Sequence, residues 1–183
     1  REVEELLKRI RELVKRNNEK TKRLLDESRR LNEEANRRLD KVLKELRDLA
    51  KRIKEELDEK GGEDERAKKR VEDMLRRLEE LLREATKDSE RMLKENRELV
   101  DRIREEDKRV LEELDKLVKE ILERNKEDED LEREVKKLLD ENRESSERVI
   151  RESEKSLRDH AERTRKVREE IRKLLEELKR AVE

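Results

Sequence analysis

Apolar residues in this chain recur at intervals of 18, and this spacing constrains the fold more than any other feature of the sequence. Leu7, Leu25 and Leu43 form one such series within residues 3–57. Eighteen residues complete five turns of an α-helix, whereas a heptad repeat would impose a left-handed supercoil. The apolar series together cover an arc of about 120°, which is wide enough for one buried face. The spacing therefore predicts a long, nearly straight helix.

Two further segments, 67–122 and 131–182, carry the same 18-residue pattern. Gly61 and Gly62 separate the first helix from the second, since glycine readily takes the left-handed conformation that ends helices. Glu63, Asp64 and Glu65 then place negative charge where the dipole of the next helix favours it.

The second break contains neither glycine nor proline and is predicted from phase. A helix continued from Ile121 to Leu131 would carry its new apolar stripe outside the old arc. A turn is therefore expected within 124–130, with Asn125 ending one helix and Asp128 or Asp130 capping the next.

Three helices of similar length joined by short turns must run antiparallel in sequence. The predicted fold is all-α, an up-down-up bundle of three long, nearly straight helices at about 2–59, 64–124 and 129–182. We expect this bundle to be a single domain spanning 1–183.

The composition excludes several classes of function. Charged residues make up 61% of the chain, but 55 basic and 56 acidic side chains are intermixed, and the 29% that are hydrophobic are periodic, which argues against disorder. Nucleic-acid binding is not expected, because acids alternate with the bases and no aromatic side chain is available for stacking. No apolar run is long enough to span a membrane, so we expect a soluble chain.

The predicted inward face of the third helix turns polar between residues 142 and 164. In two antiparallel helices joined by a turn, residues at the same height along the bundle have numbers with a constant sum. The estimated sum is about 124 for the first and second helices and about 253 for the second and third. Ser28 then lies level with Asn96, Asn17 with Asp107, and Asn32 with His160 or Ala161. The polar residues sort into two zones. One zone holds Ser28, Asn32, Asn36, Thr86, Ser89, Asn96, Ser156, His160 and Thr164, and the other holds Asn17, Asn18, Thr21, Asp107, Asn142, Ser145, Ser146 and Ser153.

A buried polar group without a partner costs about 1–3 kcal/mol, so sliding one helix by a turn would set amides and hydroxyls against leucine. Such groups can fix helix register and oligomeric state. The predicted buried polar network consists of Asn17, Thr21, Ser28, Asn32, Ser89, Asn96, Asp107, Asn142, Ser146, Ser153, Ser156, His160 and Thr164.

Two of these positions, His160 and Asp107, allow more than one interpretation. His160 is the only histidine and the chain has no cysteine, so no zinc site is expected, and no glycine-rich turn offers an oxyanion hole for catalysis. We interpret it as a neutral histidine bonded within a polar layer, with a pH response as the alternative. Asp107 either accepts hydrogen bonds from Asn17 or Ser146 or lies where the stripe is open to water.

The 18-residue repeat, the absence of aromatic residues, the Glu/Lys/Arg surface and the polar layers resemble de novo designed parametric helical bundles with buried hydrogen-bond networks. The resemblance covers the whole chain. It implies a designed scaffold without natural enzymatic activity, cofactor, metal or small-molecule substrate, obtained by recombinant cytoplasmic expression. The alternative is a binding or assembly module that forms homo-oligomers or accepts a fourth helix, with the third helix as a displaceable latch.

Overall fold

The computed structural model describes residues 2–60 and 64–182, and it is all-α over those residues. Its helices are α1 (Glu2–Lys60), α2 (Glu65–Arg124) and α3 (Glu129–Val182). These bounds agree with the predicted ones to within one residue, so the helix assignment is confirmed. The predicted break at Gly61 and Gly62, together with Glu63, lies outside the described residues.

Side chains of the α2–α3 turn satisfy the backbone groups that the helix ends leave free. The Asn125 side-chain amide donates to the Ile121 carbonyl oxygen at 3.1 Å. Asp128 Oδ1 accepts a hydrogen bond from the Leu131 backbone N–H at 3.1 Å, which is the N-cap arrangement. The predicted turn is confirmed, and Asp128 rather than Asp130 is the capping residue.

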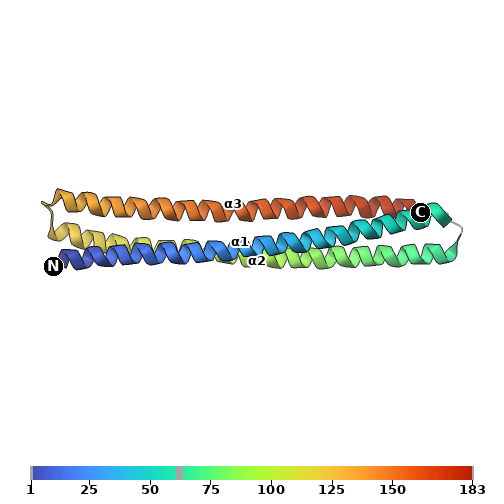
Figure 1. Ribbon diagram of the computed structural model, residues 1–183, viewed down its shortest axis with the longest axis horizontal. Helices are drawn as coiled ribbons and strands as arrows, with labels where there is room; N and C mark the ends of the chain where they lie inside the picture. Colours follow the sequence, from blue (N-terminus) through green and yellow to red (C-terminus); the bar gives the residue numbers. More distant parts are fainter. Residues whose placement is uncertain (1, 61–63, 183) are drawn as a thin grey trace. The chain divides into compact units, whose positions relative to one another are not determined.

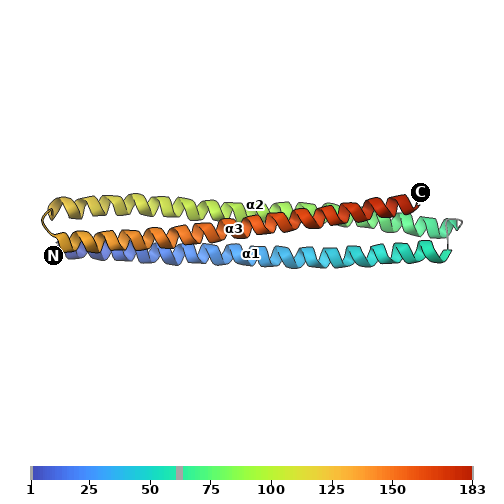
Figure 2. The ribbon, with the colours of Figure 1, turned by 90° about the horizontal axis from the view of Figure 1, so that it is seen from above.

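The chain divides into two compact units, each built from parts of all three helices. Unit 1 comprises Arg1–Arg30 and Asn96–Ser156, and unit 2 comprises Leu31–Glu95 and Leu157–Glu183. Within each unit the three helical segments lie side by side, with α2 antiparallel to α1 and α3 (Figure 1 and Figure 2). The predicted up-down-up three-helix bundle is confirmed.

Each unit has its own apolar cluster, to which all three helices contribute. The unit 1 cluster includes Ile10, Leu114, Ile121, Leu131 and Val135, and the unit 2 cluster includes Leu46, Ile53, Val71, Leu78, Ile171 and Leu178. Burying one such side chain contributes about 1.5–3 kcal/mol, so these clusters are the main favourable term in packing the helices. No helix in the described part of the chain is apolar over a stretch long enough to cross a membrane.

Candidate functional site: the buried polar residues

Twelve of the thirteen residues of the predicted polar network are buried. Their exposed fractions range from 0% at Ser28, Asn142 and Ser153 to 8% at Asn32 and Asp107. Ser156 is half-buried and has an interaction partner. The remaining buried members are Asn17, Thr21, Ser89, Asn96, Ser146, His160 and Thr164.

In unit 1, the Asn17 side chain of α1 reaches polar atoms on both other helices. Its Nδ2 lies 3.5 Å from Asp107 Oδ1, 3.3 Å from Asn142 Oδ1 and 3.4 Å from Ser146 Oγ. All four side chains are at most 8% exposed. These four residues, called the Asn17 cluster below, join α1, α2 and α3 through one amide group. Asp107 accepts a hydrogen bond from Asn17, which is the first of the two interpretations given for it above.

The Asp107 carboxylate determines which way the Asn17 amide must face. An ionised carboxylate only accepts hydrogen bonds, so Asn17 must present its Nδ2 rather than its oxygen. Two amide hydrogens then serve three acceptors, and all three distances are long for hydrogen bonds. Asn17 Oδ1 and Asn142 Nδ2 are buried and have no partner among the described residues. The cluster is only partly satisfied, so it is a poor source of stability.

A second contact in unit 1 joins α1 to α2. The Ser28 hydroxyl donates to Asn96 Oδ1, and both residues are at most 1% exposed. The two residue numbers add to 124, which is the sum predicted for α1 and α2 residues at the same height along the bundle. After a slip of one helical turn in either direction, the Ser28 hydroxyl would instead face the apolar Met92 or Val100.

In unit 2, His160 contacts Asn36 of α1. His160 Nδ1 and Asn36 Oδ1 are 3.1 Å apart, so Nδ1 carries the proton and donates it to the amide oxygen. His160 Nε2 is buried without a partner, and burial together with the nearby Arg163 lowers the pKa of His160 below its ordinary value. The histidine is therefore neutral at pH 7.

Asn36 corrects the predicted levels between α1 and α3. Those levels placed His160 beside Asn32, which lies one helical turn before the observed partner. Asn36 is only half-buried. It was predicted to share a polar zone with His160, although the predicted network did not include it. Asn17 and Ser146 are 129 residues apart and do follow the predicted levels, so the His160 contact departs from them by one helical turn at this position alone.

Several predicted network hydroxyls bond to their own helix. Thr21, Ser153 and Thr164 donate to the backbone carbonyl oxygens of Asn17, Ile150 and His160 at 2.8, 2.8 and 2.9 Å. Such local bonds satisfy a buried hydroxyl without reaching a neighbouring helix. Among the described residues, these three hydroxyls donate no hydrogen bond to another helix. Asn17, Ser28 and His160 differ, because their side chains do reach another helix.

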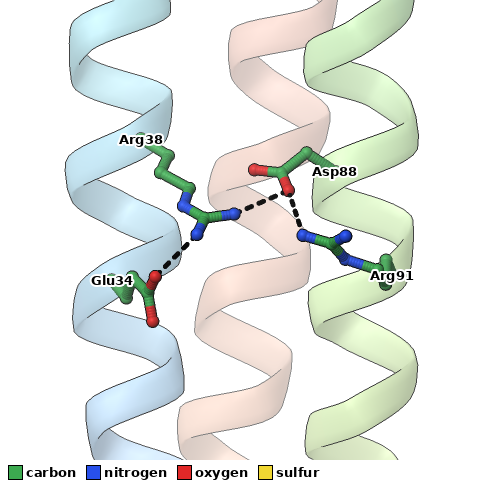
Figure 3. A network of polar contacts seen from close by, with 4 residues as sticks. All are labelled: Glu34, Arg38, Asp88 and Arg91. Atoms are coloured by element: carbon green, nitrogen blue, oxygen red, sulfur yellow. Dashed lines mark hydrogen bonds and ion pairs between the residues drawn. The ribbon is translucent and has the colours of Figure 1, made fainter.

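Charged side chains beside the core form cross-helix contacts that the sequence reasoning assigned to solvated faces. In Figure 3, Arg38 of α1 lies between Glu34 of its own helix and Asp88 of α2, and Arg91 approaches the same Asp88. The Arg38 nitrogens lie 2.7 Å from Glu34 and 2.8 Å from Asp88. Asp88, and then Glu34, raise the pKa of Arg38 above its ordinary value. An 18-residue spacing of charges does not identify such contacts, because exposed charges without a cross-helix partner among the described residues carry the same spacing.

Comparison with known proteins supports the fold. No protein family and no curated protein matches the chain. It is similar to a solved structure described as a computationally designed three helix bundle, with 22% sequence identity and a TM-score of 0.56. The similarity covers 99% of this chain and 87% of that one. The resemblance to designed helical bundles is thus confirmed for the fold.

Within residues 2–60 and 64–182, no group of His, Cys, Asp and Glu side chains could hold a metal ion.

Proposed function

We propose that this chain is a designed structural scaffold, a closed monomeric bundle without natural catalytic activity. The supporting observation is that no large hydrophobic side chain is exposed anywhere in the described residues. A groove built to receive a fourth helix or a second copy would leave an apolar stripe uncovered. The proposal includes no nucleic acid, membrane, cofactor or small-molecule partner, and it treats the whole chain as one domain.

The second part of the proposal concerns the buried polar residues, which we assign to register and helix pairing rather than to stability. The unpartnered atoms of the Asn17 cluster support this, because a group kept for stability would be fully bonded. Ser28–Asn96 and His160–Asn36 add one cross-helix contact each.

The mass of the chain in solution tests the scaffold. Light scattering over a wide concentration series should give the mass of one chain at every concentration. A stable dimer or trimer would refute the closed monomer and favour the assembly module.

A displaceable α3 is the second candidate function, and one observation favours it. Within the described residues α3 contributes five buried hydrophobic side chains, whereas α1 contributes nine and α2 twelve. Helix α3 therefore has the smallest apolar contribution to hold it in place. A labelled peptide of residues 129–182 incubated with the intact chain should exchange into the bundle if α3 is a latch, and it should remain free if the bundle is closed.

A further inference from the structure

Four ion pairs between α1 and α2 repeat with the period of the apolar core. Their α1 members are Glu2, Lys20, Arg38 and Glu56, which are spaced by 18 residues. Their α2 partners are Arg124, Glu106, Asp88 and Arg70, also spaced by 18, and the two numbers of each pair add to 126. The nitrogen–oxygen distances are 2.8 Å for Glu2–Arg124, 2.9 Å for Lys20–Glu106, 2.8 Å for Arg38–Asp88 and 2.7 Å for Glu56–Arg70.

The same relation holds separately in each unit. Glu2–Arg124 and Lys20–Glu106 belong to unit 1, and the other two pairs belong to unit 2. Three of the four carboxylates are less than one third exposed, at 25% for Glu106, 29% for Asp88 and 19% for Glu56. Salt screens partly buried charges less than fully exposed ones, so these pairs are favourable sites for electrostatic discrimination.

The order of the signs matters more than the number of pairs. Along α1 the four charges run negative, positive, positive, negative, and along α2 they run positive, negative, negative, positive. Two copies of α1 would meet like charge to like charge in either direction, and so would two copies of α2. An α1–α2 pair in the observed register meets opposite charges at all four positions.

Slipping one helix by 18 residues leaves the apolar stripes in phase, so the apolar pattern by itself does not oppose this error. The buried polar residues oppose it, because Ser28 would then face Leu78 or Leu114. The charges oppose it as well. A slip by one repeat sets Lys20 against Arg124 and Glu56 against Asp88, and only Arg38 with Glu106 remains opposite in sign. After a slip by two repeats, every remaining pair consists of two charges of the same sign.

We propose that these four pairs form a pairing code, by which α1 selects α2 in one register and rejects a second copy of itself. We refer to the eight residues as the seam code. This role deepens the proposed scaffold function. It rests on one part of that proposal, which is that α1 pairs with α2 of the same chain. The buried polar residues and the seam code are separate devices, because they share no residue.

A charge-reversal cycle in the full chain tests the seam code. One variant reverses α1, another reverses α2, and a third carries both sets. The α1 set is Glu2→Arg, Lys20→Glu, Arg38→Glu and Glu56→Arg, and the α2 set is Arg70→Glu, Asp88→Arg, Glu106→Arg and Arg124→Glu. At low salt the α1 reversal and the α2 reversal should each raise the unfolding equilibrium constant by about tenfold or more. The variant that carries both reversals should return most of the way to the wild-type constant.

The cycle isolates the cross-helix coupling. Bonds within one helix, such as Arg38 with Glu34, are lost in the single and double variants alike, so they cancel. A matched control reverses Glu5, Arg23, Lys41 and Glu59, which are exposed, carry the same sign order and make no cross-helix ion pair within the described residues. The control should change the constant by less than about threefold, as surface substitutions usually do.

A mixing experiment measures whether α1 of one chain pairs with α2 of another chain when their charges match. The α1-reversed and α2-reversed chains each have mismatched seams, but the α1 of one matches the α2 of the other. Refolded together from urea they should form a heterodimer, and refolded apart they should not. Absence of coupling in the cycle, a control as damaging as the seam reversals, or no heterodimer would overturn the seam code while leaving a monomeric scaffold intact. A wild-type mass above one chain would instead overturn the scaffold and leave the coupling measurable.

Discussion

Replacing Asn17 with leucine should destabilise the bundle although it adds apolar surface. The substitution removes the only described side-chain donor to Asp107 Oδ1 and leaves Asn142 Oδ1 without its Asn17 contact. Asp107 is 8% exposed and Asn142 is fully buried, so neither recovers full hydration. Leaving a buried carboxylate and an amide oxygen unpaired should lower the free energy of unfolding by about 2–4 kcal/mol, allowing for the long distances and the added burial of leucine.

A second substitution determines whether this loss comes from the stranded carboxylate. Removing it with Asp107→Leu in the Asn17→Leu background should recover most of the stability, since two polar partners replaced by apolar groups cost little. The double variant should therefore be more stable than Asn17→Leu alone. Asn18→Leu is the matched control: Asn18 is the half-buried neighbour, and its substitution should change stability by only about 0.5 kcal/mol.

Urea unfolding followed by far-UV circular dichroism at pH 7 measures all of these variants. The reasoning fails if Asn17→Leu is as stable as the wild type, because the Asn17 cluster would then carry no cost of stranded polar groups. It also fails if the double variant is no more stable than Asn17→Leu alone.

Three further predictions concern single residues. The pKa of His160 is lower in the folded chain than the ordinary value near 6.5, so its contribution to stability is complete above that pH and is lost as pH falls through the folded pKa, with a slope of at most about 1.4 kcal/mol per pH unit. Unfolding of the wild type and His160→Leu between pH 7 and pH 5 should show this slope in the wild type alone, and parallel curves would exclude it. Asp128→Ala removes the acceptor for the Leu131 N–H and should cost about 1 kcal/mol in urea unfolding, whereas an unchanged midpoint would show that the cap contributes nothing. Thr164→Val removes only a bond to the His160 carbonyl and should change stability by less than about 1 kcal/mol, so a larger loss would reveal a cross-helix role.

The sequence alone determined the helices, their bounds and the inward face. An 18-residue apolar period is a local property of α-helix geometry, so it needs no knowledge of the partner helix. Helix direction followed from the short turns, and the height of Ser28 against Asn96 followed from counting residues back from the first turn. These inferences succeed because a regular helix advances by a constant rise per residue.

Only the tertiary structure decided which polar atoms meet. His160 contacts Asn36 rather than Asn32, although Asn17 and Ser146 meet at the predicted level, because a side chain can reach a partner one helical turn away from its own height. Thr164 satisfies its hydroxyl on its own helix, and that choice depends on a side-chain rotamer and on the space that neighbouring helices leave. Charges such as Arg38 and Asp88 lie just outside the apolar arc, where sequence periodicity cannot separate a solvated face from a cross-helix contact. Side-chain pairing requires the distance between helices, and a single-helix pattern does not contain that distance.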